Sequence, residues 1–437
     1  MMRSIPAGAT GNPYSVLVVG SGAREHALVW ALSRSPSVSE IWAAPGNPGI
    51  ADLAHVVDFS AGDVEGIAVW ARAHDVGLVV VGPEAPLALG LVDILQARGI
   101  AVFGPTRAAA ELEWSKAFAK DFMRRHGIPT ASFGVFTDLS AALAFARSAA
   151  YPLVIKADGL AAGKGVLICA TTGEADTAIR SLLLDRAFGA AGERIVIETF
   201  LEGEELSVIA LVDGERIAIL PPARDYKRLA DGNLGPNTGG MGSYAPVNDL
   251  DSDLLRIVRD TILEPTVAGL RAEGRPYCGA LYAGLMLTRD GPMALEFNCR
   301  FGDPETQVIL PLLGGDLAAL LRSCAEGRLD PDSIATLPGA AVCVVLAAAG
   351  YPSSPRSGDA IDGIVEALGD GALVFQAGTD VRDGQLVTAG GRVLSVVGRG
   401  SDLAQAAAHA YTAAGMIHFS GKLMRRDIAM TPALHPA

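Results

Sequence analysis

Four short apolar runs, each followed by a segment of helical composition, fill residues 14–105. They read YSVLVVG, EIWAAPG, GLVVVG and IAVFG. Continuous apolar runs are typical of strands in a parallel sheet covered on both faces, and strands that alternate with helices build such a sheet. We therefore predict a doubly wound parallel-sheet domain over 14–105, preceded by a disordered leader at 1–13.

The first turn of this domain carries part of a dinucleotide-binding fingerprint. Gly20 and Gly22 follow the first strand, but Glu25 stands where the fingerprint requires Gly or Ala. An acidic side chain would face the pyrophosphate there, so a nicotinamide-dependent oxidoreductase is kept only as an alternative. The helix that begins after Gly22 is still a candidate to hold a single phosphate, because unpaired N–H groups gather at a helix start.

A second glycine-rich turn ends an apolar run at 150–166, AYPLVIKADGLAAGKGV. Its lysines and glycines are Lys156, Gly159, Gly163, Lys164 and Gly165. Glycines let backbone N–H groups turn toward an anion, and lysine adds a compact positive charge. The segment is not an ordinary P-loop, since Gly165 stands where the magnesium-binding Ser or Thr belongs. We predict a strand that delivers a loop for a nucleoside triphosphate, with a flexible surface turn as the alternative.

The middle of the chain, 106–338, predicts a further α/β domain in which 130–203 form a small α+β lid lobe. One long helix at 107–127 carries Lys116. Residues 223–245 are too polar and glycine-rich for regular structure, and loops of that length are usually functional, so we predict a lid there. Other expected elements are strands at 206–220, a helix at 252–273, a hairpin turning at Asp290-Gly291, and helical segments at 304–328.

The last part of the chain, 339–428, predicts a small α+β module. Strands are expected near 341–348, 372–378 and 386–397, and a helix near 402–414. The longest apolar stretch of the chain, 338–350, is too short to span a bilayer.

The segment MALEFNCRFGDPE places polar side chains on one face of an apolar strand. Glu296, Asn298 and Arg300 share that face, and Leu295, Phe297 and Cys299 take the other. A carboxylate and an amide oxygen two residues apart suit Mg²⁺, and an arginine fork suits a carboxylate or phosphoryl group. A solvated strand face with a surface ion pair is the alternative, but nearby Asp303 and Glu305 favour a site.

Charge and cysteine content limit the classes of partner. Lys and Arg number 35 against 48 Asp and Glu, a net charge of −13 without a long basic run, which argues against nucleic acid and membrane partners. The five cysteines are scattered without a CxxC pair, so no disulfide framework or zinc site is indicated. With 50% hydrophobic residues, we expect a compact cytoplasmic protein.

Several long motifs, in their order along the chain, resemble the glycinamide ribonucleotide synthetases, which are phosphoribosylamine-glycine ligases of the ATP-grasp superfamily. The resemblance covers about residues 14–428 and is carried by Lys116, KADGLAAGKG after Ile155, IVIETFLEGEE, GPNTGGMG and EFNCRFGDPETQ. GSGAREHAL, APGNPG, VGPEAPL and TAGGRVLSVVGRG add to it. The departures are Ala23, Thr199, Met424 and Tyr226, the last of which stands where a histidine is common.

This resemblance implies roles for individual residues. The ATP side would comprise Lys116 and Lys156 on the phosphates, the loop with Gly159, Gly163, Lys164 and Gly165, the adenine hinge at Glu198, Phe200 and Leu201, and Glu205 on the ribose. Glu296 and Asn298 would bind Mg²⁺, with Mn²⁺ as the alternative ion, while Arg300 and Asp303 would address glycine. Catalysis would rest on Arg300, Lys156, Lys116 and Asp303. The amine substrate would contact Gly20, Gly22, Glu84, Asp225, Lys227, Asn237, Thr238, Gly239 and Gly240, together with Arg300 and Asp303.

The implied activity is an ATP-dependent ligation in purine biosynthesis. The glycine carboxylate would attack the ATP γ-phosphate, and the amine of 5-phosphoribosylamine would then displace phosphate from the acyl phosphate. Lids at 158–165 and 235–243 would close over that intermediate, in a monomer or weak homo-oligomer. A sister ATP-grasp ligase that uses bicarbonate or formate, the oxidoreductase above, and a non-enzymatic nucleotide-binding module are the alternatives.

Overall fold

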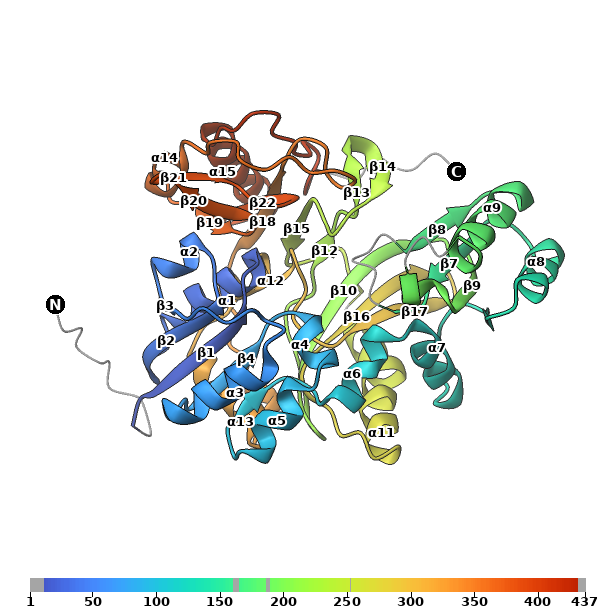
Figure 1. Cartoon of the computed structure of the whole chain (residues 1–437), viewed down its shortest axis with the longest axis horizontal. Coiled ribbons are helices and arrows are strands. Elements are labelled where there is room, and N and C mark those ends of the chain that lie inside the picture. Colours follow the sequence, from blue (N-terminus) through green and yellow to red (C-terminus); the bar gives the residue numbers. More distant parts are fainter. Residues whose placement is uncertain (1–11, 160–164, 186–188, 252, 431–437) are drawn as a thin grey trace.

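The computed structural model describes residues 12–159, 165–185, 189–251 and 253–430. The predicted leader therefore lies almost wholly outside the described residues. Figure 1 shows the blue N-terminal domain beneath the red C-terminal module, with the green lid lobe at the opposite end of the molecule. Within the described residues, no helix combines the length and apolar character needed to cross a membrane.

The N-terminal domain is the predicted doubly wound parallel sheet. Its strands are β1 (Tyr14–Gly20), β2 (Val38–Pro45), β3 (His55–Val56), β4 (Leu78–Val81) and β5 (Val102–Phe103), in the order β3-β2-β1-β4-β5. All neighbours are parallel. The helices are α1 (Ala23–Leu32), α2 (Pro48–Ala51), α3 (Val64–Ala73), α4 (Glu84–Ala88) and α5 (Leu91–Ala97). The sequence did not predict β3, which has only two residues, both exposed.

The single long helix predicted at 107–127 is wrong, because two helices meet at Ser115. They are α6 (Arg107–Trp114) and α7 (Lys116–Arg125). Ser115 has extended backbone angles, φ −123° and ψ 105°, and its hydroxyl accepts a hydrogen bond from Phe118 N at 3.1 Å. A serine cap satisfies an N–H group that the helix start would otherwise leave unpaired. The break places Lys116 at the first position of α7, where its side chain can leave the helix.

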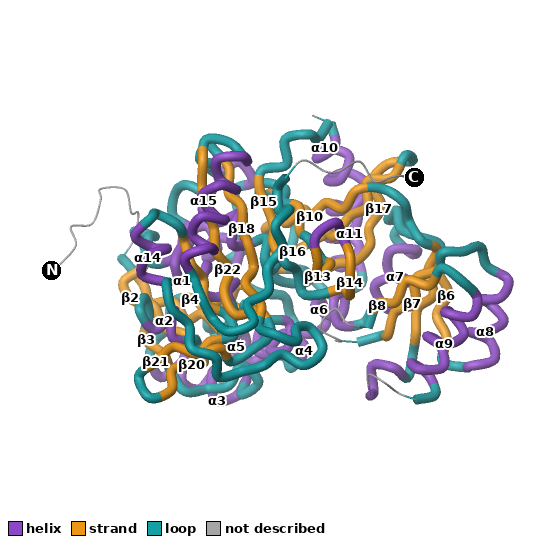
Figure 2. The backbone as a smooth tube through the Cα atoms, turned by 90° about the horizontal axis from the view of Figure 1, so that it is seen from above, coloured by secondary structure: helices purple, strands orange, loops and turns teal. Residues whose placement is uncertain are grey.

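The lid lobe is an antiparallel sheet with two helices packed together on it. The sheet order is β6-β9-β7-β8, with β6 (Phe133–Phe136), β7 (Leu153–Ala157), β8 (Val166–Cys169) and β9 (Ile195–Thr199). The helices α8 (Leu139–Ser148) and α9 (Thr172–Leu183) bury small apolar residues against it. Both views place this lobe at one end of the molecule (Figures 1 and 2).

A second antiparallel sheet lies beside the lid lobe. Its order is β11-β10-β16-β17, with β10 (Glu204–Asp213), β11 (Ile217–Ile219), β16 (Cys278–Thr288) and β17 (Gly291–Asn298). The hairpin turn is one residue earlier than predicted, because Thr288 pairs with Gly291 around Arg289 and Asp290. The pairing also shifts between Gly284 and Leu285, which leaves Leu295 in a bulge. The predicted alternation of faces therefore holds from Glu296 onward but not at Leu295.

The predicted absence of regular structure at 223–245 is also wrong. This segment holds β12 (Arg224–Asp225), a small hairpin of β13 (Arg228–Ala230) and β14 (Leu234–Asn237), and β15 (Gly242–Ala245). The strand β15 is fully buried and pairs in antiparallel orientation with β18 (Ala340–Ala347), so the backbone of β18 supplies hydrogen-bond partners for β15.

The C-terminal module builds one sheet on that pairing. Its order is β12-β15-β18-β22-β19, with β19 (Leu373–Gln376) and β22 (Arg392–Gly400). The single strand predicted at 386–397 is two strands, since β21 (Gln385–Thr388) pairs instead with β20 (Thr379–Arg382). The helices α14 (Ile364–Gly369) and α15 (Leu403–Met416) complete the module.

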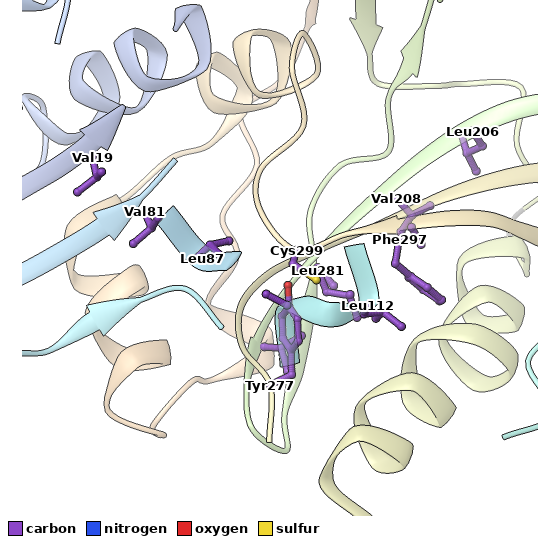
Figure 3. Close-up of a cluster of buried hydrophobic side chains, with 14 of the residues drawn as sticks. Val19, Val81, Leu87, Leu112, Leu206, Val208, Tyr277, Leu281, Phe297 and Cys299 are labelled. Atoms are coloured by element: carbon purple, nitrogen blue, oxygen red, sulfur yellow. The ribbon is translucent and has the colours of Figure 1, made fainter. Parts of the chain in front are cut away.

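The remaining helices are α10 (Leu254–Val258), which continues through a π-helical turn at Arg259–Leu263 into α11 (Glu264–Ala272), and α12 (Thr306–Ile309) and α13 (Leu317–Ala325). Of these helices, α10 and α13 contact the second sheet, while α12 packs against α1 and β18. One buried apolar cluster runs from Val19 and Val81 of the first sheet to Val208 and Phe297 of the second (Figure 3). The N-terminal domain and the second sheet thus share a core, which holds the end of β17 in a fixed position relative to α4 and α6.

Candidate functional site

Three charged side chains from three elements meet where the lid lobe faces the second sheet. Glu198 on β9 is 2% exposed, and its two carboxylate oxygens lie 2.9 Å from Lys120 Nζ of α7 and 2.9 Å from Lys156 Nζ of β7. Lys156 also donates to the carbonyl of Leu295 in the β17 bulge, at 3.3 Å. The site therefore joins both sheets through one lysine.

This lysine–glutamate group carries more positive than negative charge. Burial, reinforced by the neighbouring charge of Lys156, lowers the pKa of Lys120 to about 8. Burial alone would raise the pKa of Glu198, but the two lysines outweigh it and hold that pKa below its usual value. A buried carboxylate between two lysines leaves one positive charge without a counterion, so an anionic ligand would stabilise the arrangement.

The base of the predicted phosphate loop is anchored to the start of α7. The Asp158 carboxylate accepts hydrogen bonds from Ala117 N at 3.0 Å, the Ser115 hydroxyl at 3.2 Å and Arg194 Nε at 2.6 Å. Lys116 Nζ donates to the Gly159 carbonyl at 2.9 Å. The aspartate thus ties the loop base to the helix from which Lys116 extends.

The predicted loop itself is only partly described. Gly159 has φ +103°, a conformation that suits glycine, and Ala157 N donates to the Gly165 carbonyl at 2.8 Å, which closes the base of the turn. Gly163 and Lys164 lie outside the described residues. Phe200 and Leu201, the predicted hinge after Glu198, are half-buried and connect β9 to β10 between the two sheets.

The polar face of β17 lies opposite the lysines. Burial alone would raise the pKa of Glu296, but Lys227, Lys156 and Lys116 outweigh it and lower the pKa of this carboxyl group. Among the described residues, no hydrogen bond or ion pair is made by the Glu296 carboxylate. An ionised carboxylate with its oxygens available beside an amide oxygen is a suitable partial shell for Mg²⁺.

The described residues do not form a metal centre from protein ligands alone. Within the described part of the chain, no group of three or more His, Cys, Asp and Glu side chains is arranged to hold a metal ion. Glu296 and Asn298 would therefore supply two oxygen ligands, and phosphate oxygens and water would complete the shell, as is usual for Mg²⁺.

Arg300 follows the end of β17 rather than lying within it. Its Nη2 donates to Asn298 Oδ1 at 3.1 Å and lies 3.1 Å from Glu113 Oε1, and its Nη1 donates to the Phe301 carbonyl at 3.1 Å. Its Nε is buried and, within the described residues, has no hydrogen-bond partner; Glu84 Oε2 lies 3.7 Å away. A buried donor without an acceptor is costly, so this edge of the guanidinium is suited to receive an anionic ligand.

Asp303 is placed against the N-terminal domain. Burial alone would raise the pKa of Asp303, but Arg392 and Arg24 outweigh it and lower that pKa. Gln307 Nε2 donates to Asp303 Oδ1 at 2.8 Å. A Cβ placed on Gly22 would lie 3.8 Å from Asp303 Oδ2. Gly22, predicted to contact the amine substrate, therefore lies beside Asp303, predicted to bind the substrate glycine.

The Glu25 carboxylate lies at the start of α1, where the sequence placed a candidate phosphate. Gly22 N donates to Glu25 Oε2 at 2.6 Å, and Cβ atoms added at Gly20 or Gly82 would lie within 2.5 Å of the Glu25 side chain. Glu25 therefore occupies the space that a dinucleotide pyrophosphate would need. A single phosphate at this helix start stays a prediction, with one N–H group of the start, that of Gly22, already bonded to Glu25.

The remaining candidates lie along β12 to β15. Lys227 Nζ and Glu205 Oε2 form an ion pair at 2.5 Å. Burial alone would lower the pKa of Lys227, but the charges of Asp225 and Glu205 outweigh it and raise that pKa well above its usual value. Burial raises the pKa of Asp225 to about 7. Asn237 pairs with Arg228, while the Thr238 hydroxyl donates to the Lys227 carbonyl at 2.8 Å.

The glycines of this segment are held by the C-terminal module. Arg392 Nη1 donates to the Gly239 carbonyl at 2.6 Å and lies 3.3 Å from Asp303 Oδ1. Gly240 has φ +111°, and a Cβ there would lie 2.5 Å from Pro304 Cδ. Arg392 thus connects β22, the Gly239 turn and Asp303.

The side chain of Tyr226 contacts the C-terminal segment, at Arg425 and Ala429. Its hydroxyl accepts a hydrogen bond from Ala429 N at 3.0 Å, its ring lies under the Arg425 guanidinium, and burial raises its pKa to about 12. It therefore anchors the C-terminal segment.

Sequence reasoning missed Lys120, Glu113, Asp158 and Arg392. Lys120 could have been found, because it lies four residues after Lys116 on one helix face. Asp158 and Arg392 lie within the quoted motifs KADGLAAGKG and TAGGRVLSVVGRG, but their partners, like those of Glu113, are distant in the chain, so the sequence assigned them no role.

Family comparisons cover almost all of the chain. Residues 14–113 match the phosphoribosylglycinamide synthetase N domain, 114–306 its ATP-grasp (A) domain, and 341–431 its C domain. A curated phosphoribosylamine–glycine ligase of Yersinia pestis is 48% identical over 418 residues, 95% of this chain and 98% of that protein. The trifunctional purine biosynthetic protein adenosine-3 of Gallus gallus is 50% identical over 94% of this chain, which spans only 42% of that longer protein.

Solved structures show the same fold. The crystal structure of a phosphoribosylamine–glycine ligase from Thermotoga maritima aligns with a TM-score of 0.85 at 38% identity, over 94% of this chain and 99% of that one. The biotin carboxylase domain of the Hydrogenobacter thermophilus 2-oxoglutarate carboxylase, solved with MgADP and bicarbonate, aligns with a TM-score of 0.70 at 19% identity, over 94% of this chain and 91% of that one. The latter likeness concerns the fold alone.

Proposed function

The chain belongs to the phosphoribosylglycinamide synthetase family, and from this membership we propose how its own residues ligate phosphoribosylamine to glycine in purine biosynthesis. The enzyme is an ATP-grasp ligase. The observation that carries the proposal is the buried Lys120–Glu198–Lys156 group with its excess positive charge, placed opposite the available carboxylate of Glu296. One wall carries more positive than negative charge and the other offers metal ligands, which together suit a metal-bound triphosphate.

ATP would lie between the lid lobe and the second sheet. Lys116 and Lys156 would contact its phosphates, with Gly159, Gly163, Lys164 and Gly165 in the covering loop. Because the Glu198 carboxylate is paired with both lysines, the backbone from Glu198 to Leu201 would hold the adenine. Glu205, 42% exposed at the start of β10, would reach the ribose by exchanging its ion pair with Lys227.

Glu296 and Asn298 would hold Mg²⁺, with Mn²⁺ as an alternative ion. The hydrogen bond from Arg300 to Asn298 fixes the amide oxygen on the same face as the Glu296 carboxylate. When bound, the ion would neutralise charge on the phosphate oxygens.

Arg300 and Asp303 would orient glycine through its carboxylate and its ammonium group, respectively. The glycine carboxylate attacks the γ-phosphate of ATP, ADP leaves, and the acyl phosphate is then attacked by the amine of phosphoribosylamine, which releases phosphate and forms the amide. Two anions meet in the first step, so the cations of Lys116, Lys156 and Arg300 would offset their repulsion.

Phosphoribosylamine would enter between the N-terminal domain and the segment β12–β15. Gly20, Gly22 and Glu84 would line one side, and Asp225, Lys227, Asn237, Thr238, Gly239 and Gly240 the other. Lids at 158–165 and 235–243 would exclude water, because an acyl phosphate hydrolyses readily. We also propose a monomer or weak homo-oligomer in the cytoplasm, with small molecules as its only substrates.

The test is the substrate dependence of ADP release, with the added glycyl group identified by product mass. ADP should appear only with glycine and phosphoribosylamine together. Release with bicarbonate or formate would instead indicate another ATP-grasp ligase. Lys156→Ala and Glu296→Ala should abolish phosphate release, and near-normal turnover by either variant would contradict the site assignment.

A further inference from the structure

The guanidinium of Arg300 is held in one orientation by a glutamate that sequence reasoning did not single out. We propose that Glu113 is a positioning residue, which fixes Arg300 so that its Nε edge receives the carboxylate of the acid substrate. The inference rests on the proposed function, because it concerns how glycine is gripped before it reacts.

Both oxygens of Glu113 are used. Oε1 lies 3.1 Å from Arg300 Nη2, and Oε2 accepts a hydrogen bond from Cys299 N at 2.6 Å. The Glu113 side chain is 6% exposed, and burial raises the pKa of its carboxyl group. Because the Glu113 carboxylate bridges the Cys299 N–H and the Arg300 guanidinium, it fixes the Arg300 side chain relative to the end of β17.

The packing of α6 determines where Glu113 lies. Leu112, its neighbour, and Cys299 belong to the same cluster of buried side chains (Figure 3). The Cys299 thiol lies 3.9 Å from the Ala109 carbonyl of α6. The helix is thereby held against the end of β17, which places Glu113 beside Arg300.

This arrangement leaves one edge of Arg300 for a ligand. Nη2 is shared by Glu113 and Asn298, and Nη1 donates to the Phe301 carbonyl. The buried Nε has no hydrogen-bond acceptor among the described residues. Across it lies Glu84, whose side chain is 34% exposed and whose nearest oxygen is 3.7 Å away.

The two glutamates beside Arg300 therefore differ in role. Glu113 is buried and in contact with the guanidinium, whereas Glu84 is more exposed and lies at the Nε edge, to which we assign the substrate carboxylate. Without Glu113, Arg300 Nη2 would lose a charged partner, and the guanidinium could turn toward Glu84. The Nε edge would then be blocked by a carboxylate of the protein itself.

The substitution Glu113→Gln tests the proposal, because an amide offers one acceptor where the structure uses two. A hydrogen bond to a charged group contributes enough to change affinity by about tenfold or more. We expect KM for glycine to rise about tenfold or more, while KM for ATP stays within about twofold. Glu111→Gln is the matched control, since Glu111 lies on the same helix in an ion pair with Arg275 and should leave both constants unchanged.

Glu113→Asp serves as the second variant in case the glutamine variant does not fold. It keeps the charge but is one methylene shorter, so it can reach only one of its two partners, and KM for glycine should again rise selectively. Unchanged KM for glycine in a folded variant, or equal rises for glycine and ATP, would overturn the proposal. Absence of glycine-dependent ADP release in the unmodified enzyme would instead refute the proposed function, and this inference with it.

Discussion

Removing the positive charge of Lys120 should both destabilise the protein and weaken its hold on ATP. Lys120 and Glu198 are each 2% exposed, and 2.9 Å separates their charged atoms, so this ion pair is shielded from solvent. Breaking a buried ion pair costs roughly 3–5 kcal/mol. Because Lys156 still pairs with the other oxygen of Glu198, we expect a loss near the lower limit for Lys120→Met, about 3 kcal/mol.

The charge argument is tested by a double-mutant cycle. Glu198→Gln should also be destabilising, since it leaves two buried lysines without a carboxylate. The double variant Lys120→Met/Glu198→Gln removes both charges of one pair, so its loss should be smaller than the sum of the single losses by about 2 kcal/mol. Urea unfolding followed by tryptophan fluorescence measures the midpoints from which these differences are taken.

A surface pair on the same helix provides the matched control. Arg124 and Asp121 lie 2.6 Å apart with side chains 67% and 38% exposed, so a cycle with Arg124→Met and Asp121→Asn should give a coupling below about 1 kcal/mol. If the losses at Lys120 and Glu198 add to within about 0.5 kcal/mol, the buried pair is not coupled and the reasoning is refuted. In the active enzyme, KM for ATP should rise in Lys120→Met, because Lys156 becomes the only counterion of Glu198.

Further expectations concern Lys120, the loop base at Asp158, and Gly240 on the opposite side of the site. Because the pKa of Lys120 is about 8, phosphate binding should raise that pKa, so protons are taken up near pH 8. The affinity for ATP should therefore fall as the pH rises beyond that value. Calorimetry in buffers of different ionisation enthalpy measures this uptake, and its absence would contradict the expectation. Asp158→Asn should raise KM for ATP several-fold without changing KM for glycine, while Asp176→Asn in the same lobe changes neither; equal effects of the two variants would contradict an anchoring role. Gly240→Ala should lose about 1–3 kcal/mol of stability and most activity, since its φ is +111° and the new Cβ would meet Pro304; a normal melting temperature would rule this out.

The parts of the fold that local patterns specify were predictable from the sequence. The strands β1, β2, β4 and β5 of the first domain are apolar runs that alternate with helices, so a parallel sheet follows from the pattern. The exposed two-residue β3 and the order β3-β2-β1-β4-β5 do not follow from it. The strand β15 was missed because Gly242–Ala245 carries little strand signal alone, and its partner β18 lies far along the chain. The end of α6 was missed because Ser115 caps α7 through contacts that composition does not reveal.

The candidate site divides in the same way. Glu296, Asn298 and Arg300 could be proposed together because they alternate in the sequence, although only Glu296 and Asn298 lie within β17. Glu113 could not be proposed, because its role depends on how α6 packs against the end of β17, a contact between segments far apart in the chain. Glu25 is a local case, because it lies three residues after Gly22, and the sequence already indicated an acidic side chain at this turn.

The pairing of β15 with β18 also has a consequence for biosynthesis on the ribosome. The segment that holds β12 and β15 leaves the ribosome before any residue of β18. The backbone N–H and C=O groups of β15 that pair with β18 therefore have no partner strand while the intervening chain is synthesised. The polar, glycine-rich composition of this segment is suited to that interval, because it disfavours aggregation through an unpaired strand edge. The weak strand signal that hid β15 in the sequence would then protect the nascent chain until its final sheet can close.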